Sequence, residues 1–413
     1  MIKKFIFIFS FFFSFLASAQ EGSSSPYSFY GIGDVRFRGT IDTRSMGEVS
    51  VIPDSIHINL QNPAMMSNIK LTTFSAAGTF SPVVLKTSSQ KEKAQRTTLD
   101  YLSVVMPAKR FSVGFGLMPY SAVGYNVLNR SNPNFVYSFK GTGGVNRVYT
   151  ALSVKLNKQF NIGAEIQYNF GEIETVNITT TQIETSTREI NTSSIGGFSF
   201  NLGLSHQVKI TDKLSIFSGL TYTPETELNL SNERNISIVQ VTDLGEEIVY
   251  DQENIDVPSS KIKSPSKISF GTSIGELKKW VIGTQITHQS SSNFGNRVQN
   301  LSNSSYEDGL KFSIGGYFIP KYNSFTSYLS RVTYRGGFRY ENTGLVINNL
   351  SVLDRAVTFG LGLPLNGTFS NINIGFEFGK RGTTNAGLIE ENYSNIMVGF
   401  SFNDKWFQRR QYN

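Results

Sequence analysis

The three histidines, His57, His206 and His288, are the first candidates for chemistry because an imidazole titrates near neutral pH. They lie far apart in the sequence, and neither a Ser–His–Asp order nor a metal-ligand spacing joins them. The chain has no cysteine, which excludes a thiolate nucleophile, a thiolate metal site and disulfide bonds. No pair of carboxylates suggests acid–base catalysis. We therefore predict a protein that is not an enzyme and that needs no metal or other cofactor.

Residues 141–144 (Gly-Thr-Gly-Gly) have the composition of a phosphate-binding loop but not its context. Such loops lead through Lys and Ser or Thr into a helix, and this sequence does not follow here. We interpret the stretch as a loop that enters a strand. A formal charge of +7 and a pI near 9.3 could suggest a nucleic-acid partner. Because the basic residues are scattered along the chain, we expect no nucleic acid.

The sharpest arrangement of charge is a row of arginines on one predicted strand. Over residues 331–340, Arg331, Arg335 and Arg339 alternate with apolar side chains. Successive side chains of a strand point to opposite faces, so we expect the three arginines to form a vertical ladder on the inner face. The ladder could attract anions into a conduit. We favour the simpler interpretation that it pairs with acids of the N-terminal segment. The expected outward residues are Val332, Tyr334, Phe338 and Tyr340, and the expected acidic partners are Asp34, Asp42, Glu48 and Asp54.

The same alternation of apolar and polar residues recurs along the whole chain. In residues 393–402, Ile396, Val398, Phe400 and Phe402 share one face, and small or polar residues occupy the other. Residues 160–170, 198–205 and 371–378 repeat the pattern. A low charged fraction of 17% and an aromatic fraction of 13% are typical of a membrane barrel with aromatic girdles.

The connections between these segments alternate between short turns and long polar stretches. Short turns on one side and long loops on the other are typical of an outer-membrane barrel. We therefore predict an all-β fold, a transmembrane antiparallel up-and-down β-barrel of about fourteen strands that spans residues 70–402. A soluble periplasmic β-protein is the alternative. The expected turns are residues 107–110, 157–159, 210–213, 275–279, 320–328 and 364–370, and the expected loops are residues 81–97, 120–145, 171–194, 223–264, 289–308, 341–353 and 380–392.

The two ends of the chain differ from the barrel. Residues 1–19 combine two lysines, an apolar run and a final Ala-Ser-Ala, which predicts a secretory signal peptide; an N-terminal membrane anchor is the alternative. Residues 403–413 form a basic tail that we expect in the periplasm. Export and a barrel together predict integral insertion into the outer membrane of a Gram-negative bacterium, in contact with its lipid.

Residues 20–69 do not alternate and are rich in glycine, serine and proline. A barrel of this size is wider than its own side chains can fill, so we expect this segment to form a hatch inside the lumen. It contains Arg44-Ser45-Met46-Gly47 and Asn62-Pro63-Ala64. Proline fixes φ and asparagine can bond to its own backbone, so the second motif predicts a tight turn.

Residues 235–250 are expected to form an extracellular hairpin around the turn at residues 243–247. The hairpin is rich in apolar β-branched residues and is surrounded by acids, a combination that is common in protein-docking surfaces. The alternative is that it buries these residues against neighbouring loops. The candidate docking residues are Ile236, Ile238, Val239, Val241, Ile248 and Val249.

The two motifs of the N-terminal segment carry a family resemblance. Asn62-Pro63-Ala64, placed after Arg44-Ser45-Met46-Gly47 and before the first strand, resembles the hatch of FadL-type outer-membrane barrels. Residues 141–147 and the ending at residues 403–407 are similar to patterns of the Bacteroidota branch of that family. The resemblance implies a plugged barrel of about fourteen strands. It also implies one of two activities, because some members pass hydrophobic compounds inward and a relative in type IX secretion is a protein-binding accessory.

Two functions therefore remain open. The first is an accessory subunit of an envelope machine, for outer-membrane protein assembly or type IX secretion, that docks protein partners through its outside loops. The second is a conduit for small hydrophobic compounds such as long-chain fatty acids. The predicted lumen is mostly polar and charged, which favours the accessory subunit. An open pore and an enzyme are less well supported.

Overall fold

The computed structural model describes residues 23–132, 134–181, 185–241, 247–292, 294–295 and 303–406. The predicted signal peptide and most of the predicted basic tail lie outside these residues. No helix in the described ranges has the length and apolar character needed to cross a membrane.

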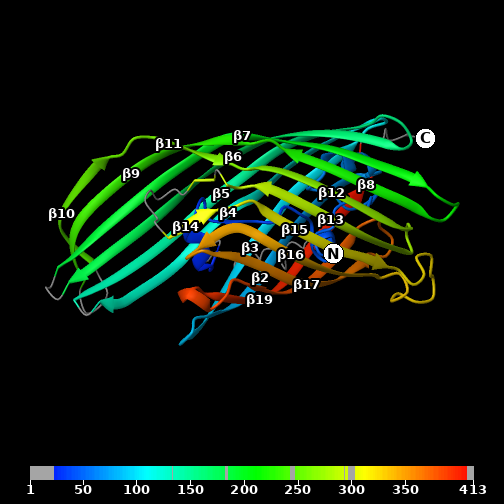
Figure 1. Cartoon of the computed structure of the whole chain (residues 1–413). Coiled ribbons are helices and arrows are strands. Elements are labelled where there is room, and N and C mark those ends of the chain that lie inside the picture. The colour runs from blue at the N-terminus through cyan, green and yellow to red at the C-terminus, as the bar shows by residue number, and fades with distance from the viewer. Residues whose placement is uncertain are drawn as a thin grey trace, which may run out of the picture.

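Fourteen antiparallel strands close into a barrel, as the sequence predicts. Each strand pairs with its neighbours around the wall, and the last strand returns to the first through a ladder that places Phe400 opposite Ala76. The barrel strands run at a slant around the lumen (Figure 1). In wall order they are β2 (Thr72–Lys86), β3 (Lys91–Pro107), β4 (Phe111–Asn132), β5 (Phe135–Lys155), β6 (Phe160–Thr181), β7 (Ser186–Lys209), β8 (Ser215–Thr223), β12 (Ser266–Glu276), β13 (Trp280–Ser290), β15 (Gly309–Phe318), β16 (Thr333–Ile347), β17 (Leu350–Pro364), β18 (Asn371–Arg381) and β19 (Glu390–Asp404).

The alternation of the strands separates an apolar outer surface from a polar interior. On β19, Ile396, Val398, Phe400 and Phe402 are exposed, whereas the intervening inward residues are buried. On β6, Ile166 and Tyr168 are exposed while Glu165, Gln167 and Asn169 are buried between them. A strand of period two can satisfy both environments at once, which is why such short patterns specify the orientation of each wall strand.

The short turns lie where the sequence predicts them, but much of the sequence expected as long loops is strand. β6 and β7 stay paired from Phe160–His206 to Thr180–Ser186, and β16 and β17 meet at a two-residue turn. That turn consists of Asn348 and Asn349, whose φ values of 50° and 61° match the left-handed conformations of a type I′ hairpin turn.

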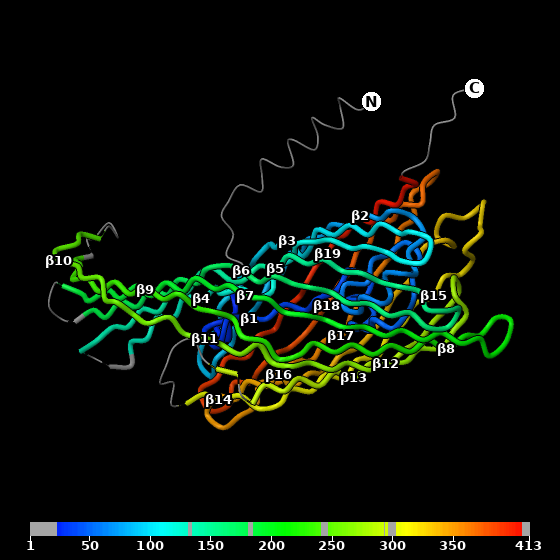
Figure 2. Tube along the Cα trace, turned by 90° about the horizontal axis from the view of Figure 1, so that it is seen from above, coloured from blue at the N-terminus to red at the C-terminus, as the bar shows by residue number. Residues whose placement is uncertain are grey.

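Beyond the barrel, the sheet continues on the side opposite the short turns. β9 (Thr226–Val241) pairs with the upper part of β7, and β10 (Glu247–Asp256) and β11 (Ser260–Ser264) pair with β9. β14 (Ser304–Tyr306) adds to β16. Figures 1 and 2 show β9 and β10 projecting from this end of the barrel. The hairpin expected at residues 235–250 thus belongs to this extension.

Residues 23–71 precede β2 and lie inside the barrel, where they pack against the wall. A core cluster joins Ile41, Ile58, Leu60 and Met66 of this segment to wall residues such as Tyr101 and Met397. The core of the molecule is therefore the contact between the N-terminal segment and the inner wall. The elements of the N-terminal segment are η1 (Pro26–Phe29), β1 (Asp34–Val35), α2 (Ile41–Arg44) and η2 (Pro63–Asn68). A further short helix, η3 (Asn385–Gly387), lies between β18 and β19.

Candidate functional site

Arg44-Ser45-Met46-Gly47 forms the end of α2 and the turn that follows it. Gly47 has φ +64°, and a Cβ there would lie 2.7 Å from the carbonyl oxygens of Ile314 and Phe338. The wall offers matching space, because a Cβ at Gly315 would lie 2.1 Å from the Met46 carbonyl oxygen, and one at Gly337 would lie 2.2 Å from the Gly47 nitrogen. Backbone thus meets backbone here, which only glycine permits. The turn is fixed further by a 2.9 Å hydrogen bond from Gly47 N to Thr358 Oγ1.

Asn62-Pro63-Ala64 forms the start of η2 and makes a second close contact with the wall. The Asn62 side chain accepts a 3.0 Å hydrogen bond from Ala64 N, and Pro63 occupies the first helical turn. A Cβ at Gly163 would lie 2.4 Å from Ala64 N, and one at Gly203 would lie 2.2 Å from Asn62 Oδ1. Both sequence motifs therefore lie against pairs of wall glycines. Sequence reasoning missed these glycines, although their positions on inward faces were a signal.

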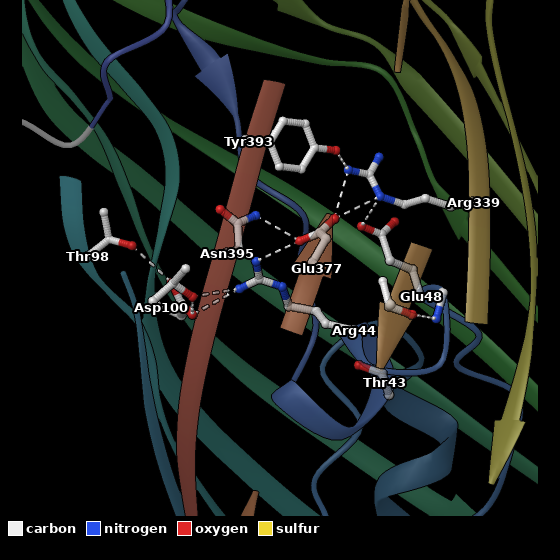
Figure 3. A network of polar contacts seen from close by, with 12 residues as sticks. Thr43, Arg44, Glu48, Thr98, Asp100, Arg339, Glu377, Tyr393 and Asn395 are labelled. Atoms are coloured by element: carbon white, nitrogen blue, oxygen red, sulfur yellow. Dashed lines mark hydrogen bonds and ion pairs between the residues drawn. The ribbon is translucent and has the colours of Figure 1, made fainter. Parts of the chain in front are cut away.

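A network of buried ions connects the first of these turns to the wall. Glu377 of β18 lies between two guanidinium groups, at 3.0 Å from Arg339 and 3.4 Å from Arg44 (Figure 3). Arg44 also bonds to Asp100 of β3 at 2.9 Å. Since Arg44 belongs to the N-terminal segment, it links that segment to β3 and to β18 at once.

Glu48 gives the segment a second ionic link to the wall, at β15 and β16. Its carboxylate lies 2.5 Å from Lys311 of β15 and 3.4 Å from Arg339 of β16. All three side chains are buried. Arg339 has further carboxylate partners in Asp354 at 3.0 Å and Glu341 at 3.3 Å, whereas Glu48 is the one ion partner of Lys311 among the described residues.

The three arginines of the predicted ladder do not all belong to the strand. Arg335 and Arg339 are buried on the inner face of β16, but Arg331 precedes the strand, which begins at Thr333. Arg331 bonds instead to Asn366 at 2.9 Å among the short turns, and Val332, expected on the outside, is only 1% exposed. The alternation of inward and outward side chains holds only within the strand. The sequence alone does not show at which residue the strand begins. Of the expected acids, Glu48 pairs with Arg339, Asp34 pairs with Arg381 at 2.7 Å, and Asp54 pairs with His57 at 2.8 Å.

The wall is interrupted between β3 and β4, a feature that the sequence did not suggest. The two strands pair only from Leu102–Leu117 to Pro107–Ser112. Beyond these residues β3 continues along β2, and β4 continues along β5. β1 of the N-terminal segment pairs with β4 at Ser121 and Ala122 in this region, and Arg36 N donates to Tyr120 O at 2.9 Å. The segment therefore occupies the interior side of the gap.

Two cavities lie on either side of the N-terminal segment. The one towards the β9–β10 extension has a volume of about 230 Å³, and its lining includes many charged side chains, among them Arg36, Lys267 and Glu341. The other, at the end with the short turns, measures about 590 Å³ and includes Asp42, His57 and Arg335 in its lining. Both cavities contain buried charged side chains.

The predicted docking residues divide between the two faces of the projecting hairpin. Ile238 of β9 and Ile248 and Val249 of β10 are exposed, Ile248 at 48%. Val239 is wrong as a docking residue because it is fully buried on the other face of β9. Ile236 is half-buried, and Val241 ends β9, with its side chain outside the described part of the structure.

Comparison with known proteins now places the chain. The model of the BamG family matches residues 1–413. The chain belongs to the BamG family. No curated protein is similar to the sequence at a significant level. The barrel resembles the Pseudomonas putida toluene transporter TodX, with a TM-score of 0.60 at 18% identity over 90% of this chain and 98% of that one.

Two further solved structures show the same architecture. A Pseudomonas aeruginosa FadL homologue has a TM-score of 0.58 at 11% identity, covering 90% of this chain and 99% of its own. The CymD monoaromatic hydrocarbon channel has a TM-score of 0.57 at 12% identity, covering 93% and 100%. At these identities the likeness concerns the fold. The resemblance to FadL-type outer-membrane barrels predicted from the sequence is confirmed.

Proposed function

We propose that this BamG-family protein is an accessory subunit of an outer-membrane protein assembly machine. Its barrel is inserted in the outer membrane after removal of a signal peptide, and its projecting sheet docks a protein partner. Membership of the BamG family supports assembly over type IX secretion. The observation that carries the proposal is the N-terminal segment, which occupies the lumen and is held there by buried ion pairs from Arg44 and Glu48.

In this proposal, residues 23–71 act as a hatch that keeps the barrel closed. A hatch that moved easily would be attached by exposed, water-mediated contacts, which are weak. Here Glu48 and Lys311 are both buried, and wall glycines admit the backbone at Gly47 and Ala64. Opening a path for a ligand would separate these charges in a low-dielectric interior, which is strongly unfavourable. The barrel therefore serves as a membrane support and not as a pore.

The docking surface that we propose is the β9–β10 hairpin. β10 pairs with β9 alone among the strands that the structure describes, and all ten of its residues are exposed. Exposed strand edges offer unpaired backbone groups to another chain. Asp251, Glu253 and Asp256 have no cationic partner in the described ranges. An acidic edge with exposed Ile248 and Val249 suits a partner that brings basic and apolar side chains.

Replacement of residues 235–250 by a short Gly/Ser turn tests this proposal. We expect a folded, surface-exposed barrel that no longer co-purifies with its assembly, because the docking edge is lost. A matched shortening of the β2–β3 hairpin at residues 84–93 should leave the assembly intact. Co-purification of both shortened proteins with unchanged partners would contradict the proposal.

Uptake of small hydrophobic compounds is the second candidate. Two observations favour it: the interruption of the wall between β3 and β4, and the fold shared with proteins described as hydrocarbon channels. Against it, the segment beside the gap carries Arg36 and Arg44, and Arg44 is ion-paired to Asp100. If the barrel is a conduit, deletion of its gene should reduce uptake of a radiolabelled fatty acid or of toluene without changing outer-membrane protein levels. The accessory role predicts the opposite pair of results.

A further inference from the structure

The cavity at the end with the short turns is larger than the one towards the β9–β10 extension and takes no part in the docking proposed above. Its volume of about 590 Å³ lies within the range of small-ligand pockets, roughly 300–1,000 Å³. The N-terminal segment forms its floor with Ile52, Asp54 and His57. The start of β16 and the turns at residues 319–333 and 364–371 form its walls.

Arg335 places a buried positive charge in this cavity. Its side chain is only 7% exposed, and it makes a 2.9 Å hydrogen bond to Asn373 Oδ1. It forms no ion pair with any residue in the described ranges, in contrast to Arg339 four residues along the same strand. Asp42 and Asp54 of the same cavity act on this guanidinium through space but form no ion pair with it, so its planar set of donors remains suited to a carboxylate ligand.

The same cavity contains acceptors that an anion alone would leave unused. The buried carboxylate of Asp42 has no ion pair or side-chain hydrogen bond within the described residues. Asn371 Oδ1 is buried without a partner there. His57 Nε2 also has none, but it is a donor and not an acceptor when the imidazole is protonated. His57 Nδ1 bonds to Asp54 at 2.8 Å. Burial opposes the charge on His57, but Asp54 and Asp42 outweigh this and raise its pKa.

We propose that this cavity binds the free carboxyl end of an extended peptide. The terminal carboxylate lies on Arg335, and the backbone N–H groups just before it donate to Asp42 and Asn371. The apolar lining from Ile52, Ile56 and Phe369 accepts a side chain of the peptide. The bound chain enters between the short turns, so in the proposed membrane orientation it comes from the periplasm.

The combination of donors and acceptors distinguishes a peptide from other anions. A fatty acid offers a carboxylate to Arg335 but no N–H group to Asp42. Inorganic phosphate would bring a second negative charge towards Asp42 and Asp54, which is repulsive. A peptide terminus satisfies both sides of the cavity, because buried polar groups need partners of the opposite kind.

The test uses the full-length protein in lipid nanodiscs and a fluorescein-labelled tetrapeptide, Ser-Val-Thr-Phe, with a free carboxylate. We expect the acid to bind at least tenfold more tightly than the same peptide with a terminal carboxamide, since charged hydrogen bonds contribute the difference. Octanoate and phosphate should not displace it at ten times its concentration. Equal binding of acid and amide would overturn the proposal. So would displacement by octanoate, which indicates a lipid pocket, or by phosphate, which indicates a simple anion site.

Two variants separate the contributions of the cavity. Arg335→Gln should reduce binding of the acid about tenfold and leave binding of the amide unchanged. Asp42→Asn should weaken binding of both the acid and the amide, because both donate backbone N–H groups to Asp42. Lys155→Gln, an exposed lysine of β5 outside the cavity, is the control and should change nothing. If Arg335→Gln does not fold, as judged by heat-modifiable migration in gels, Asp42→Asn still decides: unchanged peptide binding in that variant would refute the proposed contact.

Discussion

Replacing Glu48 with glutamine should release the N-terminal segment without unfolding the barrel. Glu48 N donates to Thr43 O at 3.0 Å, and φ at Glu48 is 71°, and glutamine leaves this backbone unchanged. What changes is the charge. Lys311, itself buried, loses its one carboxylate partner within the described residues. Arg339 keeps three others.

The size of the effect follows from the uncompensated lysine. Removing one partner of a buried ion pair is typically unfavourable by about 3–5 kcal/mol. Because Glu48 belongs to the segment and Lys311 to the wall, the loss falls on the docking of residues 23–71. At ~3 kcal/mol, the population of the undocked segment rises by about 100-fold or more. The ladders that close the barrel consist of backbone hydrogen bonds, which the substitution does not change. The wall should therefore remain intact.

Hydrogen exchange measured by mass spectrometry in detergent is the assay. Amides of residues 41–69 should exchange about 100-fold faster in Glu48→Gln, while those of β17–β19 should not change. Glu341→Gln is the matched control, because Glu341 also contacts Arg339 but lies on the wall, so its loss should not free the segment. The double variant Glu48→Gln/Lys311→Met should restore protection by removing both charges. Equal exchange in Glu48→Gln and Glu341→Gln would refute the reasoning.

Three further predictions follow from the packing and the charges. Gly337→Ala places a Cβ 2.2 Å from Gly47 N and should destabilise the docked segment by about 1–3 kcal/mol, measured by limited proteolysis, whereas Gly336→Ala, whose nearest contact is 3.9 Å away, should not; equal effects would contradict the fit. Phe400→Arg should impair insertion by about 2–4 kcal/mol, measured by membrane fractionation, and normal assembly would mean that the faces are reversed. Burial favours protonation of Asp34, but Arg381 and Arg96 outweigh this and hold its pKa at about 2. The ionised Asp34 therefore stabilises the folded protein above pH 4, and this contribution is lost as the pH falls through about 2. The thermal midpoint of Asp34→Asn should therefore lie below that of the wild type at pH 7 and converge with it near pH 2, and a constant difference would contradict this sign.

The barrel could be predicted from the sequence because each wall strand carries its own two-residue period. Ile396, Val398, Phe400 and Phe402 face outward in the structure, as the alternation predicts. The positions of the short turns follow from breaks in that alternation. The length of the strands could not be predicted in this way. Beyond the membrane both faces are in water, so polar residues such as those at the tip of β6 and β7 continue the sheet without an apolar stripe.

The interior was harder to predict because its contacts join residues distant in the sequence. Arg44 and Glu377 are separated by 333 positions, and no local pattern states that they meet. The predicted ladder extended the alternation of the strand to Arg331, which precedes the start of β16. Val239 was assigned to a docking surface because the alternation of residues shows which side chains share a face of the hairpin. It does not show which of the two faces other parts of the protein cover. The gap between β3 and β4 arises because these strands pair over only part of their length. The extent of strand pairing cannot be read from the amino-acid composition.

The most direct test of the account is the state of the native protein after gentle extraction from its own membrane. Size measurement followed by mass spectrometry should find it in a stable assembly with other outer-membrane proteins, in stoichiometric amounts, and the assembly should be lost on replacement of residues 235–250. A lone barrel that carries bound lipid or hydrocarbon would contradict the accessory role and favour the conduit.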